Sequence, residues 1–315
     1  MNFKLSPAPH IHKADSTRSL MLDVVIALIP TSLAGVYFFG LKALLLLVLS
    51  MASAVLAEFV WQKLMKLPVR VGDLSALVTG LLLGLNLPVG APWWLAVLGS
   101  AIAIILVKQL FGGIGDNFLN PALVGRAILL ASWPVHLTRF TLPTGFSGVD
   151  AVSSPTVLAG YQASNMDLFL GNIPGCIGEV SKVAILIGLV YLFARRVIFP
   201  HVPVIFLGVT ALLAWVMGPQ GAFTFDGNAL QAILSGGVMF GAVFMATDYT
   251  TSPMTIKGQA WFALGCGVIV SIIRAYGSYP EGVTYAILLM NLVTPLIDKY
   301  MRPKVYGSSV QEAKA

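Results

Sequence analysis

Apolar stretches of about twenty residues recur along the whole chain, and few charged residues interrupt them. An α-helix needs this length to cross the hydrocarbon core of a bilayer. Only 10% of the 315 residues are charged, whereas a soluble domain carries roughly 25% because its surface faces water. The sequence therefore predicts an all-α polytopic membrane protein with about ten transmembrane helices.

Glycine, proline and charged residues separate most of these stretches and mark the expected ends of the helices. The predicted spans are 20–39, 41–62, 73–87, 93–111, 119–133, 180–197, 202–218, 228–247, 258–275 and 282–298. The first eighteen residues are polar, and no small-residue cleavage site follows the first apolar stretch. We therefore expect that stretch to be retained as a helix rather than removed as a signal peptide.

Positively charged residues are divided unequally between the two alternating sets of loops. One set holds Lys4, Lys13, Arg18, Lys63, Lys66, Arg70, Lys108, Arg126, Arg195, Arg196, Lys257, Lys299, Arg302, Lys304 and Lys314, and the other holds Lys42, Arg139, Lys182 and Arg274. Because loops rich in Lys and Arg face the cytoplasm, the tails 1–19 and 299–315 are expected inside and the loop 134–179 outside. The net charge of +6 is thus a topology signal, and no basic stripe with interleaved aromatics indicates a nucleic-acid partner.

The two halves of the chain repeat a sequence pattern. The stretch GDLSALVTGLLLGLNLP from Gly72, followed by GRAILL at 125–130, parallels GNALQAILSGGVMFGAVFMATD from Gly227, followed by TYAILL at 284–289. We expect two five-helix repeats, inverted relative to each other, over 20–133 and 180–298; such repeats often place a site near the midplane. The alternative is that apolar helices resemble one another by composition alone.

Two polar segments are candidates for a binding site. In the predicted outer loop, Asp150, Ser153 and Thr156 follow one another at three-residue intervals, and their hydroxyls offer either an attachment point or an ordinary helix cap or turn. In FGGIGDNFLNPALVGRA, clustered glycines precede a helix start whose N–H groups suit an anion. The candidate residues there are Gly112, Gly113, Asn117 and Asn120. No strand precedes them, so a dinucleotide-binding fingerprint is excluded, and a glycine-mediated re-entrant turn remains the alternative.

Acidic residues next to apolar helices are candidates for ion contacts, because burying a charge in a membrane is costly. Asp248 directly follows an apolar helix and precedes three hydroxyl residues, although a solvated helix end has the same pattern. Glu281 is expected to pair with Arg274 across the turn at Pro280, and Asp298 interrupts the last apolar stretch. Cys176 and Cys266 have no metal-ligand spacing and are interpreted as packing residues. No cysteine cluster or histidine pair is present to hold an iron–sulfur cluster or haem, so any redox cofactor is organic and no metal site is predicted.

The segments GGIGDNFLNPALVGRA, DAVSSPT, FMATD, SYPEGVTYAILLMN and PLID occur in this order. With them the chain resembles, over nearly its whole length, the RnfD family, which supplies a membrane subunit of the Rnf complex, an ion-translocating ferredoxin:NAD oxidoreductase. A membrane subunit of the Na-translocating NADH:quinone reductase is homologous, and the short N-terminal tail favours the Rnf branch.

The resemblance implies a flavin. The family carries FMN as a phosphoester on the threonine of an Asp-x-x-Ser-Gly-Ala-Thr pattern, which Asp150, Ser153 and Thr156 match, while Ser154-Pro155 replaces Gly-Ala. Thr156 is then the acceptor, and a flavin transferase outside the cytoplasm attaches the group. The quinone-reductase relative holds a second, noncovalent flavin such as riboflavin, which is also expected here.

The resemblance also implies partners and a location. The expected partners in the bacterial inner membrane are iron–sulfur membrane subunits, a periplasm-facing flavin subunit and cytoplasmic subunits that react with ferredoxin and NAD. Electron relay is coupled in such complexes to transport of Na⁺ or H⁺, with Asp248, Glu281 and Asp298 as candidate ion contacts here. The chain alone is expected to show no turnover. A solute channel or transporter and a cofactor-free scaffold for redox partners are the alternatives.

Overall fold

The computed structural model describes residues 16–143, 153–218, 224–277 and 281–301. The helices of the first part are α1 (Thr17–Phe39), α2 (Leu41–Leu64), η1 (Val71–Asp73), α3 (Ser75–Leu85), α4 (Trp93–Ile102) with its π-helical continuation η2 (Ala103–Gln109), α5 (Pro121–Ser132) and α6 (Pro134–Leu137). An antiparallel pair of short strands, β1 (Phe140–Thr141) and β2 (Ser153–Ser154), precedes η3 (Val157–Ala159) and α7 (Asn165–Leu170). The second part holds α8 (Lys182–Ala194), α9 (His201–Met217), α10 (Ala229–Leu234), α11 (Val238–Phe240), η4 (Gly241–Met245), α12 (Ile256–Tyr276) and α13 (Val283–Tyr300).

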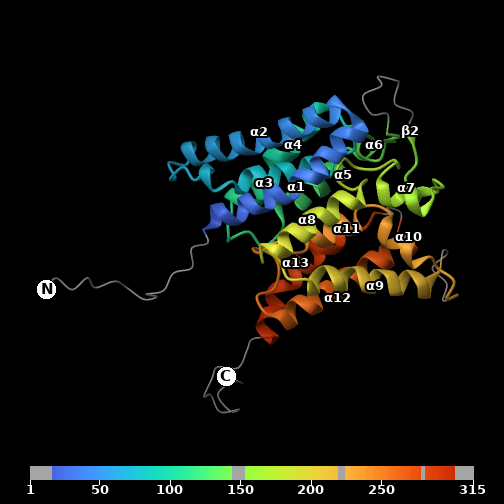
Figure 1. Cartoon of the computed structure of the whole chain (residues 1–315). Coiled ribbons are helices and arrows are strands. Elements are labelled where there is room, and N and C mark those ends of the chain that lie inside the picture. The colour runs from blue at the N-terminus through green and yellow to red at the C-terminus, as the bar shows by residue number, and fades with distance from the viewer. Residues whose placement is uncertain (1–15, 144–152, 219–223, 278–280, 302–315) are drawn as a thin grey trace, which may run out of the picture.

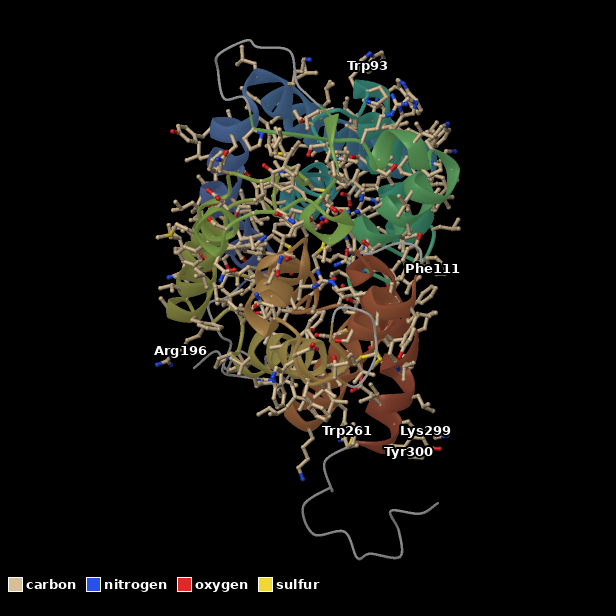
Figure 2. The ribbon with its side chains drawn as sticks, turned by 90° about the vertical axis from the view of Figure 1, so that its right-hand side faces the viewer. Trp93, Phe111, Arg196, Trp261, Lys299 and Tyr300 are labelled. Atoms are coloured by element: carbon tan, nitrogen blue, oxygen red, sulfur yellow. The ribbon has the colours of Figure 1, made fainter. Side chains whose placement is uncertain are left out.

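The protein is mostly helical, and every predicted span contains helix at the expected place. Within the described residues, three helices are long and apolar enough to cross a membrane, namely α1, α2 and α12, and several shorter helices are apolar as well. Large apolar side chains are exposed at mid-helix positions, with 64% of Leu33 and 65% of Val190 accessible. Trp93 and Trp261 likewise project from opposite rims (Figure 2). Many exposed apolar side chains of this kind suit lipid rather than water.

The helices form two groups (Figure 1). In the first, α2 packs against both α3 and α4, and in the second α9 packs against α10 and α12. The groups meet where α1 lies against α8 and where α5 lies against α13. The start of α1 and the end of α13 lie towards one end of the molecule, whereas β2, α6 and α7 lie towards the opposite end (Figure 1).

Small residues allow close helix contact in the first group. A Cβ atom added to Gly80 of α3 would lie 2.7 Å from the carbonyl oxygen of Ser50 in α2. The Ser50 hydroxyl donates to the Gly80 carbonyl at 2.6 Å and lies 2.7 Å from the Ser100 hydroxyl of α4. Small residues and buried hydroxyls are the usual means by which membrane helices associate, because apolar side chains gain little by leaving lipid.

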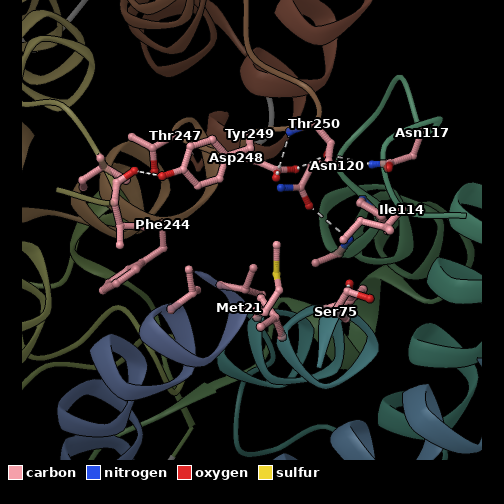
Figure 3. A pocket seen from close by; sticks show the side chains of 18 of the residues that line it. Met21, Ser75, Ile114, Asn117, Asn120, Phe244, Thr247, Asp248, Tyr249 and Thr250 are labelled. Carbon is pink, nitrogen blue, oxygen red and sulfur yellow. Dashed lines mark hydrogen bonds between the residues drawn. The ribbon is translucent and has the colours of Figure 1, made fainter. Parts of the chain in front are cut away.

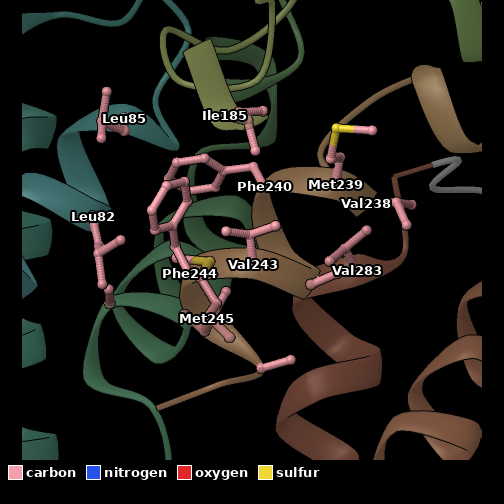
Figure 4. Close-up of a cluster of buried hydrophobic side chains, with 14 of the residues drawn as sticks. Leu82, Leu85, Ile185, Val238, Met239, Phe240, Val243, Phe244, Met245 and Val283 are labelled. Carbon is pink, nitrogen blue, oxygen red and sulfur yellow. The ribbon is translucent and has the colours of Figure 1, made fainter. Parts of the chain in front are cut away.

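The apolar core is centred on α11 and η4, between the two groups. The rings of Phe240 and Phe244 are tilted by 49° to each other at a centroid distance of 5.3 Å. They lie with Leu82 and Leu85 on one side and Val283 on the other (Figure 4). Elements α11 and η4, which carry these aromatic residues, therefore pack against both groups of helices.

The predicted single span 228–247 is wrong, because the structure breaks it into α10, α11 and η4. Ser235 is extended, and Gly236 has a φ of +59°, a conformation that residues with a Cβ rarely adopt. A Cβ atom at Gly236 would also lie 2.8 Å from Leu158 of η3. The break thus forms a notch into which the loop before α7 inserts a side chain.

The predicted outer loop 134–179 contains short helices and strands. Where it is described, it contains α6, the β1–β2 pair, η3 and α7. Phe140 pairs with Ser154 and Thr141 pairs with Ser153. Further along, the backbone N–H of Gly178 donates to the carbonyl of Leu85 at 2.7 Å, so the loop also caps the end of α3.

Candidate functional site

Thr156 directly follows β2 and precedes η3, in extended backbone geometry with φ −71° and ψ 166°. Its side chain is buried, with 6% exposed, and it makes no capping hydrogen bond to η3. The ordinary alternative, a hydroxyl that serves as a helix cap, is therefore not what this residue does. Asp150 lies outside the described residues, and for Ser153 only the backbone pairing with Thr141 is described.

A cavity of about 280 Å³ adjoins the residues after Thr156. Val157 and Leu158 form one wall, and the other walls come from three helices of the second group. From these helices the lining residues are Thr210, Leu213, Ala214 and Met217 of α9, Gly218, Gly227, Asn228, Gln231, Ala232 and Ser235 around α10, and Ser271, Arg274 and Ala275 of α12. The cavity therefore combines an apolar side with amide, hydroxyl and guanidinium groups, as binding sites for organic cofactors do.

Arg274 is the cation in this wall. Its two terminal nitrogens donate to the carbonyls of Ala232 at 2.6 Å and Ser235 at 2.9 Å, which are orphan carbonyls at the end of α10. Its Nε is buried without a hydrogen-bond partner. The predicted pairing of Arg274 with Glu281 is not formed: Glu281 instead forms an ion pair with Arg126 of α5.

Asn117 and Asn120 lie at a different cavity, of about 80 Å³, between the two groups (Figure 3). The Asn120 side chain caps α5 by accepting from the N–H groups of Ala122 and Leu123 at 3.1 and 3.3 Å. The Asn117 amide donates to the Thr250 hydroxyl at 3.1 Å. These two residues are thus brought together, but not with Thr156, which does not line this cavity.

Asp248 lies on the same cavity as Asn117 and Asn120. Its carboxylate accepts from the hydroxyls of Thr250 at 3.1 Å and Thr251 at 3.2 Å. Burial raises the pKa of Asp248, while hydrogen bonds from Thr250 and Thr251 act in the opposite direction. Asn117, Thr250 and Asp248 therefore form one hydrogen-bonded chain (Figure 3).

Gly112 and Gly113 belong to a third cavity, of about 140 Å³. Both have positive φ angles, of 120° and 109°, so the predicted glycine-mediated turn is present. The polar residues around them are Glu58, Gln62, Arg70, Asp73 and Gln109. Ile114 lines this cavity and also that of Asn117.

A buried ion pair separates these two neighbouring cavities, and sequence reasoning missed it. Lys108 of η2 contacts Glu58 of α2 at 2.9 Å, and both side chains are almost fully buried. The Lys108 ammonium also donates to the Ser75 hydroxyl at 2.6 Å, and Gln109 donates to Glu58 at 2.7 Å. The assignment of Lys108 to a charged loop is therefore wrong.

A second buried cluster joins the two groups of helices. Arg126 contacts Glu281, donates to Asn86 at 2.8 Å and reaches the sulfur of Cys176 at 3.6 Å. Glu179 accepts from the backbone N–H of Cys176 at 3.0 Å. The cluster thus sets Arg126 against two carboxylates, and the Cys176 sulfur and the carboxylate oxygens of Glu179 and Glu281 lie within 4.8 Å of one another. Arg126, like Lys108, was wrongly counted as a loop charge.

Two further residues considered in the sequence analysis, Asp298 and Cys266, lie outside the three cavities. Asp298 of α13 accepts from the backbone N–H of Met254 at 3.0 Å, whereas Glu281 lies just before the opposite end of that helix. Cys266 is packed in the apolar core. The predicted ion contacts Asp248, Glu281 and Asp298 therefore do not form one cluster.

Residues 4–307 match the model of a family described as the NQR2, RnfD, RnfE family. The chain belongs to this family. A relative from Acetobacterium woodii, named as a D-type subunit of a Na⁺-translocating ferredoxin:NAD⁺ oxidoreductase complex, is 47% identical, with 100% of this chain and 99% of the relative covered. The corresponding subunit of a proton-translocating complex from Clostridium ljungdahlii is 41% identical over 97% of this chain and 96% of its own length. That of an ion-translocating oxidoreductase complex from Halorhodospira halophila is 38% identical over 96% of this chain and 95% of its own length.

The membership in the NQR2, RnfD, RnfE family confirms the resemblance inferred from the motifs, since all three relatives are named as the same D-type subunit of such a complex. Together with the apolar helices α1, α2 and α12, it identifies the chain as a helical membrane protein.

Proposed function

We propose that this chain is the membrane subunit of an Rnf-type complex, an ion-translocating ferredoxin:NAD oxidoreductase, and that it carries FMN covalently on Thr156. The names of the full-length relatives support the assignment to such a complex. The sequence pattern of Asp150, Ser153 and Thr156 supports the flavin. The chemistry of electron transfer belongs to the flavin, and the protein supplies its position and surroundings.

The observation that carries the flavin proposal is the cavity beside Thr156. The Thr156 hydroxyl makes no cap to η3, and the next two residues line a space of about 280 Å³. A phosphoester on this hydroxyl gives the flavin a short tether to that space. Pro155 suits the attachment site as well, because it ends the extended strand β2 and fixes the backbone before the acceptor.

The same proposal includes the transmembrane arrangement: about ten helices in two inverted five-helix repeats, 20–133 and 180–298. The pairing of α1 with α8 and of α5 with α13 supports this, since the first and last helices of each half are equivalent. Both termini lie in the cytoplasm of a bacterial inner membrane, and the loop 134–179 with Thr156 lies outside. The position of β2 opposite the start of α1 (Figure 1) is in agreement.

We further propose a second, noncovalent flavin at the cavity of Asn117, Asn120 and Asp248. The amide and hydroxyl groups there offer hydrogen bonds to a heterocycle, and Phe244 offers an apolar face (Figure 3). This cavity is smaller than the one beside Thr156, so its walls must move apart to admit the ring.

Ion transport is the second part of the proposed function. Asp248, Glu281 and Asp298 are its candidate contacts, and Asp248 is the most suitable because it faces a cavity with two hydroxyls. One relative is named for Na⁺ translocation and another for proton translocation, and their sequence identities to this chain are similar. Either ion is therefore compatible with the proposed transport. The partners are iron–sulfur membrane subunits, a periplasm-facing flavin subunit and the cytoplasmic subunits that react with ferredoxin and NAD.

Co-expression with a flavin transferase tests the attachment. We expect a fluorescent band on a denaturing gel for the wild type and complete loss of this band in Thr156→Ala. Ser154→Ala is the matched control, because it removes a hydroxyl two residues away and should keep the band. A band that persists in Thr156→Ala, or no band for the wild type with active transferase, would overturn the proposal.

A reporter tests the sidedness. An alkaline phosphatase domain is active only outside the cytoplasm, so we expect activity when it is fused within 134–179 and none when it is fused after residue 301. Activity of the fusion after residue 301, with none for the fusion within 134–179, would place Thr156 on the side of the membrane that lacks the transferase and would contradict the proposal.

A further inference from the structure

We propose that Arg274 contacts the flavin ring within the cavity between α9, α10 and α12 and raises the reduction potential of that flavin. This rests on the proposed attachment of FMN to Thr156. It adds the place of the ring and the residue that sets its electron affinity.

The first step is the path from the tether to the cavity. The side chain of Leu158, two residues after Thr156, occupies the notch at Gly236, where a Cβ would lie 2.8 Å from Leu158 and 3.3 Å from the Arg274 guanidinium. Leu158 and Arg274 therefore both border the break between α10 and α11. The two residues that follow Thr156 line the same cavity as Arg274, so a group attached to Thr156 starts next to that cavity.

The second step is the unused capacity of Arg274. A guanidinium has five N–H donors in a fixed plane, and here the terminal nitrogens hold the carbonyls of Ala232 and Ser235. These bonds fix the side chain in one orientation and leave the buried Nε without a partner. A buried donor without an acceptor is costly, and a carbonyl or ring nitrogen of a bound heterocycle would satisfy it.

The third step is the positive charge of the Arg274 guanidinium. Among the residues that the structure describes, no carboxylate lies within ion-pair distance of Arg274: Glu281 contacts Arg126, and Glu281 and Glu179 act on Arg274 only through space. The carbonyls of α10 bind the guanidinium but do not cancel its charge. A fixed cation in a space of low dielectric stabilises a neighbouring group that becomes negative.

The fourth step is the electron balance. When an iron–sulfur carrier, or dithionite in a titration, passes an electron to the ring, the donor is oxidised and the ring gains one negative charge, while the phosphoester to Thr156 stays intact. Because Arg274 stabilises the reduced ring more than the oxidised ring, its positive charge raises the potential. A role limited to capping α10 would leave the potential unchanged.

The test is a spectroelectrochemical titration of the full chain, flavinylated and purified in detergent. The difference between wild type and Thr156→Ala isolates the covalent flavin. We expect a lower midpoint potential in Arg274→Gln and a value near wild type in Arg274→Lys, which keeps the charge. Lys299→Gln is the control, because it removes an exposed cation from the far end of α13 (Figure 2) and should leave the potential unchanged.

A second variant keeps the test decisive if Arg274→Gln fails to fold. Gln231→Glu adds a negative charge to the same cavity at nearly constant volume, and it should also lower the potential. With flavin present on Thr156, unchanged potentials in both variants would overturn this inference and leave the attachment standing. If Arg274→Gln does not fold, an unchanged potential in Gln231→Glu alone would have the same consequence. Absence of flavin from the wild type would instead overturn the proposed function.

Discussion

Each of two cavities has a cation in its wall, and the two cations are held in different ways. Lys108, at the cavity of Asn117, contacts the Glu58 carboxylate at 2.9 Å. Arg274, at the cavity beside Thr156, is held by the backbone carbonyls of α10. The first cation directly contacts a carboxylate, which holds α2 and η2 together, whereas the second has no carboxylate within ion-pair distance among the described residues. Of these two cavities, the one beside Thr156 therefore has the wall suited to a group that becomes negative.

Removal of Lys108 should have the largest effect on stability. Lys108→Met leaves the Glu58 carboxylate buried without its partner, and breaking such a pair costs about 3–5 kcal/mol of folding free energy. We expect a marked fall in the apparent Tm of the purified protein, with part of it restored by the double variant Lys108→Met/Glu58→Gln. Lys63→Met, at an exposed lysine of α2, is the control. An unchanged Tm in Lys108→Met would contradict a structural role for the pair.

Gly236→Ala should have an intermediate effect, confined to the cavity beside Thr156. The new Cβ meets Leu158 at 2.8 Å and forces a residue with a side chain into a φ of +59°, a strain of about 1–3 kcal/mol. We expect less flavin per protein on a denaturing gel, because η3 is displaced. Gly208→Ala is the matched control, since no atom lies within 4 Å of its added Cβ. Equal flavin content in the two variants would show that the notch does not position the tether.

Asn117→Ala should have the smallest effect. It removes the hydrogen bonds from the Asn117 amide to the Thr250 hydroxyl and to the Leu119 carbonyl, each worth about 1 kcal/mol, at the cavity proposed for the noncovalent flavin. We expect less flavin released by acid from the purified protein and an unchanged covalent band. A weaker covalent band would mean that the two cavities are not independent.

The sequence predicted the positions of the helices because apolar stretches in a membrane protein are long and interrupted by polar residues. It did not predict the break at Ser235–Gly237, since glycines also occur within unbroken membrane helices. The break became apparent only with Gly236 in a positive φ and Leu158 inserted beside it.

The site was predicted less completely, because its partners are distant in sequence. The sequence favoured the local pair of Arg274 and Glu281, whereas Glu281 pairs with Arg126, 155 positions away. Glu58 and Lys108 are 50 positions apart, and each alone resembles a charge at a helix end. A lone charge inside an apolar stretch was the available signal, because its burial requires a partner. The assignment of Thr156 as acceptor came from the family pattern and stays a prediction.

Mass spectrometry of the peptide that spans residue 156, prepared from the protein in its native host, tests the central claim most directly. The account predicts a mass increased by FMN less one water, with fragment ions that assign the addition to Thr156. A peptide recovered only in its unmodified form would contradict it.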